Sequence, residues 1–310
     1  MASDSPPKKG GTGNVYLIGA SGKLGRAILA KTGAVPVVRR GHGLKGEAVT
    51  DYSPENLKKT LAGASVIIIA AGSTDTLDRK KMREANVDLA KKVVDAAPAT
   101  SRIIFAGSVS VYGKTPERLP ADEQTPARPD SDYAKSKYEA ERIVAGFPNH
   151  VIFRIGTLYG PQFEDYNRVL SMIERGKMRI VGDGKNRVPF VHVDDVADAF
   201  RKALAKGSGV YVLAGEPLTQ AEILSIASSE LSVEAPKKRV PRAIAMFAAA
   251  LSEIGYRFGG KRPKLTREHV AVLGYDRAFD CARAKAELGF SPRPLENGIR
   301  ETVREYKKGR

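Results

Sequence analysis

A tyrosine and a lysine four positions apart, Tyr133 and Lys137, are the pair in this chain best suited to acid–base chemistry. On a helix such residues share one face, with about 6 Å between their Cβ atoms, so the Lys137 ammonium would stand beside the Tyr133 hydroxyl. The pKa of free tyrosine is about 10, and lowering it to about 7 requires roughly 4 kcal/mol from neighbouring positive charges. A tyrosine shifted in this way could pass a proton to or from a substrate hydroxyl. An exposed helix face would show the same spacing, so the interpretation depends on the surrounding elements.

The third candidate is Ser108, which follows a predicted strand over Arg102–Phe105. In open parallel sheets, ligands lie at the carboxyl ends of the strands, so we expect the Ser108 hydroxyl to bond the reacting oxygen of a substrate. Ser110 is the alternative, and both serines could instead cap the strand end. The proline-rich segment 115–132 is predicted to be a loop over this site, leading into the helix that carries Tyr133.

A strand, a glycine-rich turn and a helix stand near the start of the chain. The strand is expected over Val15–Ile18 and the helix over Arg26–Lys31. Glycines in such a turn allow close approach to a pyrophosphate, and the helix N-terminus offers free N–H groups to the anion. The middle glycine lies three positions after the first, not two. We predict a dinucleotide-binding Rossmann unit here, in preference to a plain turn, with contacts from Gly19, Ser21, Gly22, Lys23, Leu24 and Gly25.

Two arginines, Arg39 and Arg40, follow the second predicted strand, Val35–Val38. In NAD-binding proteins an acidic residue about 20 positions after the first glycine hydrogen-bonds the ribose 2′-hydroxyl. This chain has Arg39 at that position instead. An arginine suits a 2′-phosphate by its charge and its planar fork. The sequence therefore favours NADP over NAD, the alternative being two exposed arginines at a strand end.

Asp51 and its neighbour Tyr52 end a short predicted strand over Glu47–Thr50. Asp51 could contact the adenine amino group, or it could cap the helix that starts near Pro54. Both residues are included among the cofactor contacts.

The apolar run Val66–Ile69 is typical of a central parallel strand buried on both faces. The small residues after it would let a cofactor lie close; they are Ala70, Ala71 and Gly72. Asn86 stands on a helix predicted over Lys80–Ala97. It is expected to hydrogen-bond near the nicotinamide, or else to occupy an ordinary polar helix position.

Composition narrows the class of protein. With 310 residues, 42% of them hydrophobic, the chain can bury a sizeable core in one or two domains. The lone cysteine, Cys281, excludes an internal disulfide, is expected to pack in the core, and fits a reducing compartment. We expect a cytoplasmic protein, since neither a bilayer-spanning run nor a signal peptide is apparent. The polar segment Met1–Gly13 is predicted to be a disordered tail.

The net charge of +16 is concentrated near the C-terminus. The stretch Lys237–Arg310 holds 18 Lys and Arg against 8 Asp and Glu, which gives +10. Such charge attracts a phosphorylated cofactor, an anionic substrate or an anionic membrane surface, or it is simply a solvated surface. No nucleic-acid partner is expected, because no aromatic-interleaved basic motif is present. The four histidines show no ligand spacing, so no metal is expected, and His192 is interpreted as a structural hydrogen-bonder.

Taken in order, these motifs resemble the extended short-chain dehydrogenase/reductase superfamily, also called the NAD-dependent epimerase/dehydratase family. The resemblance spans about Asn14 to Tyr306. The matching residues are the glycines of the first turn, Asp51, Val66–Gly72, Asn86, Ser108–Gly113, Tyr133 with Lys137, Arg154–Pro161, Val191–Val196 and Ala284–Phe290.

The resemblance implies a role for each member of the catalytic set. Tyr133 would be the general acid/base, Lys137 would lower its pKa and bind the nicotinamide ribose, and Ser108 would orient the substrate oxygen. The cofactor would give or take hydride at the carbon bearing that oxygen. Relatives often dimerise through a pair of helices, so a homodimer is an expectation.

The fold expected is α/β, a Rossmann doubly wound parallel sheet with a smaller, interleaved C-terminal substrate lobe. Strands are predicted over Val151–Ile155, Val188–Val193 and Val210–Leu213, the second of them returning to the cofactor domain before a helix over Val196–Ala205. The predicted NAD(P)-binding domain comprises 14–158 plus 187–214. The predicted substrate lobe comprises 159–186 plus 215–310.

Two positions bear on the substrate. Family members that act on nucleotide sugars typically carry Asn where this chain has Thr157, and a diphosphate-binding Arg where it has Val188. Arg187 is one residue away and would point differently on a strand. Thr157, Arg187 and Ser110 are the predicted substrate-binding residues, and a nucleotide sugar is disfavoured.

The apolar segment Pro241–Ile254, followed by a basic stretch, resembles the C-terminal lobe of 3β-hydroxysteroid dehydrogenase and dihydroflavonol reductase relatives. This indicates a hydrophobic substrate or contact with a membrane surface. The alternative is an ordinary packed helix of the small lobe.

Three functions follow. The first is an NADP-dependent oxidoreductase that interconverts a secondary alcohol and a ketone on a small-molecule substrate. The second is a nucleotide-sugar epimerase or dehydratase that keeps NAD tightly bound and returns the hydride. The third is a dinucleotide-binding scaffold without turnover, against which the intact set of Ser108, Tyr133 and Lys137 argues.

Overall fold

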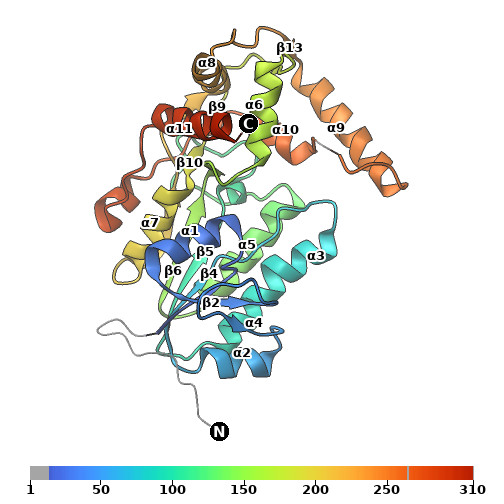
Figure 1. Cartoon of the computed structure of the whole chain (residues 1–310). Helices are drawn as coiled ribbons and strands as arrows, with labels where there is room; N and C mark the ends of the chain where they lie inside the picture. The colour runs from blue at the N-terminus through green and yellow to red at the C-terminus, as the bar shows by residue number, and fades with distance from the viewer. Residues whose placement is uncertain (1–13, 264, 310) are drawn as a thin grey trace.

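A seven-stranded parallel sheet forms the centre of the larger part of the molecule, in the lower half of Figure 1. The computed structural model describes residues 14–263 and 265–309. The predicted tail, Met1–Gly13, lies outside these residues. Across the sheet the strand order is β11-β6-β5-β4-β1-β2-β3, so the chain changes direction between β1 and β4, where ligands of such sheets bind. The strands are β1 (Asn14–Ile18), β2 (Val35–Val38), β3 (Ala48–Val49), β4 (Ala64–Ile69), β5 (Arg102–Ala106), β6 (His150–Ile155) and β11 (Gly209–Leu213).

Helices cover both faces of the sheet, because alternate residues of its strands bury apolar side chains on opposite sides. In β4, Ile68 packs with α1 (Lys23–Thr32) and α7 (Val193–Ala203). Its neighbours Ile67 and Ile69 pack on the other face, with the helices α2 (Pro54–Leu61), α4 (Leu89–Ala96) and α5 (Asp132–Ala145). The doubly wound α/β architecture predicted from the sequence is confirmed.

The helix predicted over Lys80–Ala97 is present but not uniform. It consists of α3 (Arg79–Arg83), a π-helical turn η1 (Glu84–Asp88) and α4. Such π turns inside helices are frequent at functional sites, and this one carries Asn86.

A smaller lobe lies above the sheet in Figure 1. Its core joins α6, α8 and α11 through residues such as Leu170, Leu224 and Ile299. Its elements are β7 (Thr157–Tyr159), α6 (Asp165–Glu174), β8 (Ile180–Val181), β9 (Arg187–Val188), β10 (Phe190–His192), β12 (Leu218–Thr219), α8 (Gln220–Leu231), β13 (Arg239–Val240), α9 (Arg242–Arg257), α10 (Arg267–Gly274) and α11 (Leu295–Lys308). A π-helical turn, η3 (Ala284–Leu288), precedes α11.

One predicted strand was wrong. The segment Val188–Val193 is divided into β9 and β10 at Pro189, which has no N–H to donate to a ladder. Neither piece joins the large sheet: β9 pairs with β12, and β10 pairs with β7. The helix that follows does return to the sheet domain, since α7 packs against α1.

Two smaller expectations are confirmed. His192 caps α7, its Nδ1 accepting the Asp194 N–H at 3.2 Å. Cys281 is buried, with its thiol 3.6 Å from the Ala214 carbonyl oxygen.

Within 14–263 and 265–309, no three His, Cys, Asp or Glu side chains form a group that could hold a metal ion. No helix in that part of the chain has the length and apolar character needed to cross a membrane.

Candidate active site

Ser108 lies where β5 ends, directly before the 3-10 helix η2 (Val109–Tyr112), and it is buried. Its Oγ accepts the Ser110 N–H at 3.2 Å and the Ser110 hydroxyl at 2.9 Å. A hydroxyl has two acceptor positions and one proton. Ser110 therefore fills the acceptor side of Ser108 and leaves its proton for a third partner.

Tyr133 stands in the first turn of α5. That helix begins with a capping bond, in which Ser131 Oγ accepts the Ala134 N–H at 3.1 Å. Burial raises the pKa of Tyr133 to about 12; a side-chain hydrogen bond with Ser108 opposes the rise, and the charge of Glu268 adds to it. The lowered pKa expected from the sequence is thus not produced by the protein's own groups. At pH 7 the phenol is neutral and holds a proton that it can donate.

Lys137 is buried one turn further along α5. Its Nζ donates to the Ala106 carbonyl oxygen at 2.6 Å and lies 4.6 Å from the centre of the Phe105 ring. Burial lowers the pKa of Lys137 to about 8, and the charge of Glu141 opposes this shift. Glu141 is itself paired with buried Arg154, at 2.7 Å between Oε1 and Nη2. Lys137 is therefore held at the end of β5, beside the strand that leads to Ser108.

Asn86 joins the loop after β4 to the helix of Tyr133. Its Oδ1 accepts the Ser73 N–H at 2.7 Å, while its Nδ2 donates to the Ser73 carbonyl at 3.0 Å and to Ser136 Oγ at 2.9 Å. A Cβ added to Gly72 would lie 3.0 Å from Asn86 Oδ1 and 3.6 Å from Lys137 Nζ. Asn86, Gly72 and Lys137 therefore meet at one place.

The glycine-rich turn between β1 and α1 has the form of an anion cradle. Helix α1 begins at Lys23, after the N-cap residue Gly22, and has no acidic residue in its first turn. No described side chain caps it, so its first N–H groups are free for a pyrophosphate. A Cβ at Gly19 would lie 2.5 Å from Ala71 N, and one at Gly25 would lie 2.1 Å from the Gly19 oxygen. These residues fit a dinucleotide. Because the glycines have no side chains, α1 packs closely against the end of β1 and the loop after β4, while the N–H groups at the start of α1 stay open to a pyrophosphate.

The rest of the turn borders the lobe and β4. Lys23 Nζ lies 3.1 Å from Asp165 Oδ2 of α6 and 5.1 Å from the centre of the Phe163 ring. Ala70 N donates to the Ile18 carbonyl at 3.0 Å, which fixes the start of the loop after β4. The partly buried Ser21 and Leu24 complete the predicted set.

Arg39 and Arg40 are exposed directly after β2. The Arg39 guanidinium lies 5.3 Å from the centre of the Tyr52 ring, and Tyr52 donates its hydroxyl to the Val37 carbonyl at 3.1 Å. Tyr52 holds a φ of 61°, which is uncommon for a residue with a side chain and often marks a functional site. The aromatic ring thus positions Arg39 at the edge of the cradle.

Asp51 supports the start of α2, the second of its two predicted roles. It accepts the Ser53 N–H at 2.8 Å and the Asn56 side-chain amide at 3.0 Å. These bonds lower the pKa of Asp51 to about 2. The N-cap itself is Ser53.

The two predicted substrate residues of the lobe are both bonded within it. Thr157 N donates to the Pro189 carbonyl at 2.7 Å. Arg187 forms a bidentate pair with Asp276, at 2.9 Å from Nε to Oδ1 and 2.6 Å from Nη2 to Oδ2.

Two charged residues were missed from the sequence: Glu268, whose charge acts on Tyr133, and Arg277, whose charge acts on Glu268. Glu268 of α10 hydrogen-bonds Ser131, and burial raises its pKa while this bond and the Arg277 charge oppose the rise. Arg277 is 6% exposed, and its Nε has no hydrogen-bond partner among the described residues. Both lie more than 130 positions after Tyr133, and no local motif marks them.

A cavity of about 960 Å³ lies in the smaller lobe. Ser108, Tyr133 and Lys137 are not among its described lining, so it is distinct from the cluster around Tyr133. The lining includes Asn186, Arg242, Met246, Gly274, Tyr275 and Asp276.

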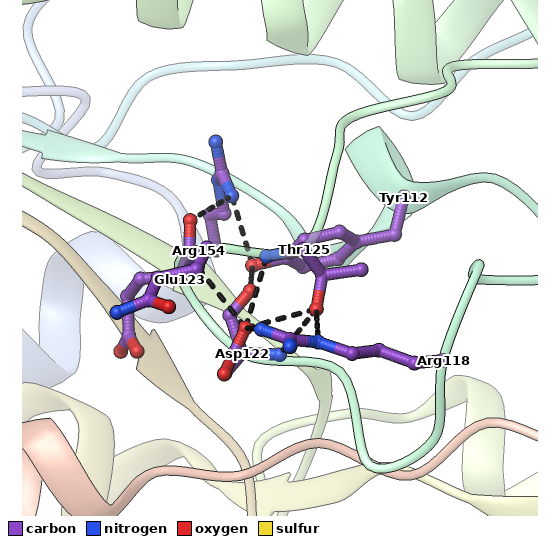
Figure 2. A network of polar contacts seen from close by, with 7 residues as sticks. Tyr112, Arg118, Asp122, Glu123, Thr125 and Arg154 are labelled. Carbon is purple, nitrogen blue, oxygen red and sulfur yellow. Dashed lines mark hydrogen bonds and ion pairs between the residues drawn. The ribbon is translucent and has the colours of Figure 1, made fainter.

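The loop before α5 is held by the polar network in Figure 2. Arg154 Nη1 donates to the Tyr112 hydroxyl at 2.9 Å, and Tyr112 donates to the Asp122 carbonyl at 2.7 Å. Arg118 Nε donates to Thr125 Oγ1 at 3.0 Å across the same loop. The predicted loop over the site is therefore fixed to β6 and η2.

Known proteins resemble this chain over more than half of its length. The model of a family described as the NAD dependent epimerase/dehydratase family matches residues 15–214. The 3beta-hydroxysteroid-dehydrogenase/decarboxylase isoform 1 of Arabidopsis thaliana is 30% identical over 304 residues, covering 84% of this chain and 69% of that protein. For isoform 2 the match covers 49% of that protein.

Two further comparisons extend over nearly the whole chain. An N-acetyl-alpha-D-glucosaminyl-diphospho-ditrans,octacis-undecaprenol 4-epimerase of Escherichia coli O157:H7 is 24% identical and covers 94% of each chain. The structure of MoeE5 in complex with UDP-glucose and NAD superimposes with a TM-score of 0.73 at 23% identity, covering 96% of this chain and 99% of that one. The latter likeness shows the fold.

Proposed function

Since this chain belongs to the NAD dependent epimerase/dehydratase family of nicotinamide-dependent enzymes, we propose that it is an NADP-dependent oxidoreductase that interconverts a secondary alcohol and a ketone. The observation that carries the proposal is the meeting of Ser108, Tyr133 and Lys137 at the carboxyl end of β5. The open cradle at the start of α1 supports a dinucleotide beside them.

Tyr133 is the proposed general acid/base. In ketone reduction the neutral phenol gives its proton to the substrate oxygen, and in alcohol oxidation the phenolate takes the proton back. Ser108 donates a hydrogen bond to the same oxygen. Its hydroxyl proton is available for this bond, since Ser110 fills only the acceptor positions of Ser108 Oγ. When bound, the nicotinamide supplies or accepts the hydride at the carbon bearing that oxygen.

Lys137 is proposed to bind the nicotinamide ribose and to help lower the pKa of Tyr133 when the site is complete. Its Nζ already donates a hydrogen bond to the carbonyl oxygen of Ala106, the last residue of β5. Asn86 is proposed to hold the loop after β4 against the helix of Tyr133, next to this lysine, through its bonds to Ser73 and Ser136.

The remaining contacts divide between the two ends of the cofactor. The glycine-rich turn, with Ser21, Lys23 and Leu24, is proposed to hold the pyrophosphate, and Ala70, Ala71 and Gly72 to flank it. Arg39 and Arg40 are proposed to bind the 2′-phosphate of NADP, with Asp51 and Tyr52 beside the adenosine. NADP is preferred because Arg39 is exposed and braced by the Tyr52 ring, where it can present its fork to a phosphate.

The substrate is proposed to be a small, hydrophobic molecule that contacts Thr157 and Arg187. Ser110, the third predicted substrate residue, is proposed to act on it through Ser108, whose Oγ it hydrogen-bonds. The hydroxysteroid-related name of the Arabidopsis thaliana relative supports this class. The predicted boundaries between sheet domain and substrate lobe, at residues 158/159, 186/187 and 214/215, are kept in the proposal except for β7, β9 and β10, which belong to the smaller lobe. A homodimer and a cytoplasmic location are also part of the proposal.

A second candidate is an epimerase or dehydratase that keeps NAD bound and returns the hydride. The Escherichia coli O157:H7 relative, which covers 94% of this chain, favours it. Thr157 and Val188 argue against it, since nucleotide-sugar enzymes typically carry Asn and Arg there.

Mass spectrometry of ligands released from the purified protein, followed by titration with NADPH and NADH, separates the two. The oxidoreductase should be isolated empty and should prefer NADPH; sterol, flavonoid-like and lipid ketones are then screened for cofactor oxidation. Tightly retained NAD⁺ without net cofactor turnover would contradict the proposal and favour the epimerase.

A further inference from the structure

Helix α9 and its C-cap residue, Phe258, expose five large apolar side chains. The exposed fractions are 58% for Ile244, 67% for Phe247, 52% for Leu251, 50% for Ile254 and 87% for Phe258. Their spacing of three and four residues places them on one side of the helix. We call these five residues the α9 face. Figure 1 shows α9, in orange, at the outer edge of the smaller lobe.

The opposite side of α9 is packed with small residues. Ala245 is 7% exposed and Ala249 is 2% exposed, and both join a cluster with Val181 and Val270. Glu253, also on the inner side, accepts the Arg267 N–H at 2.7 Å and its Nε at 2.8 Å. The helix is therefore firmly seated by its small side chains, and the exposure of the large ones is not a consequence of a loose helix. Contiguous exposed apolar surface of this kind marks an interaction site.

Positive charges flank the α9 face. Lys238 and Arg239 precede the helix and Lys261 follows it; all three are exposed and have no ion-pair partner among the described residues. Two more exposed cations near these ends are already paired, Lys237 with Glu234 and Arg262 with Asp75. From 237 to 262 the sequence holds a single acidic residue, the buried Glu253.

We propose that the α9 face docks on an anionic lipid surface, with the helix lying in the plane of the interface. An apolar face between cations is the pattern that binds such surfaces, since the side chains enter the acyl boundary while the cations meet the headgroups. A second copy of this chain fits less well, because a shared contact would bring the same unpaired cations together. None of the five residues of the α9 face belongs to the proposed catalytic or cofactor-binding set, and the docking proposal does not depend on the proposed oxidoreductase activity.

The chain contains no tryptophan, so a single introduced one reports on its own surroundings. We would introduce Phe247→Trp in the full chain and record its fluorescence with vesicles of phosphatidylcholine alone and of phosphatidylcholine mixed with phosphatidylglycerol. The matched control is Val49→Trp, at a position that is 58% exposed on β3 in the sheet domain. The proposal predicts a blue shift for Phe247→Trp with the anionic vesicles only, and none for Val49→Trp.

Vesicle sedimentation gives the second readout. Phe258→Ser should weaken partitioning by about tenfold, from the loss of one buried aromatic group. Lys238→Glu and Lys261→Glu should each weaken it by at least about fivefold, because each variant loses one attracting cation and gains a repelling carboxylate. Val49→Ser should leave it unchanged. The proposal is overturned by absence of a shift with anionic vesicles, by equal binding to neutral vesicles, or by a concentration-dependent blue shift without lipid, which would indicate self-association.

Discussion

The Ser110 hydroxyl donates to Ser108 Oγ over 2.9 Å, and the Ser110 N–H bonds the same oxygen at 3.2 Å. Ser110 therefore orients Ser108, and the two serines are not interchangeable contacts to one substrate. This relationship separates their expected effects on catalysis.

Ser108→Ala should lower kcat/KM for a ketone found in the screen by about a hundredfold or more, because a donor to the reacting oxygen is lost. Ser110→Ala should cost only about five- to tenfold, since Ser108 remains but is less firmly oriented. Steady-state kinetics test both variants, with the exposed Ser65→Ala as control. Equal losses at the two positions would show that Ser110 itself contacts the substrate.

Arg39→Asp should weaken NADPH binding by about ten- to a hundredfold and change NADH binding little, because the lost bonds are charge-assisted and made to the 2′-phosphate. Calorimetric titration with each nucleotide measures both affinities. Arg142→Asp, on the exposed side of α5, makes the same change in net charge and controls for it. Equal weakening for the two nucleotides would remove the argument for NADP.

The buried ion pair between Arg154 of β6 and Glu141 of α5 should contribute strongly to the free energy of unfolding. Glu141→Leu leaves the Arg154 guanidinium buried and uncompensated, which should lower the free energy of unfolding by about 3–5 kcal/mol. The double variant with Arg154→Met should recover much of this loss. Urea unfolding measures both, and a double variant no more stable than Glu141→Leu would contradict the reasoning.

In the cofactor-free protein, Tyr133 should remain neutral well above pH 7, because burial raises its pKa to about 12. As the pH rises, the proton is held until the pH nears that value. Ultraviolet difference spectra between the native protein and Tyr133→Phe should therefore show no phenolate from Tyr133 below about pH 10. A phenolate appearing between pH 7 and 8 would show that the protein alone lowers this pKa.

Much of the sheet domain was predictable because its signals are local. The continuous apolar runs of β1, β2 and β5 located these strands to within a residue, and the glycine-rich turn marked the cradle. The strand over Val188–Val193 failed because its apolar run outweighed the break at Pro189.

Contacts that depend on tertiary packing could not be predicted from the sequence. Arg187 meets Asp276 across 89 positions, and Glu268 acts on Tyr133 from a different lobe. In α9, both sides of the helix are apolar, so the sequence alone could not tell that Ala245 and Ala249 pack inward while Phe247 faces out.

The most direct test of the account is single-turnover ketone reduction by Tyr133→Phe with saturating NADPH. The variant keeps the ring and loses only the hydroxyl, so NADPH affinity should be unchanged within a few-fold while the rate falls by about 10²–10⁴. A variant that binds NADPH normally and reduces the ketone at the native rate would contradict the assignment of Tyr133 as the general acid/base.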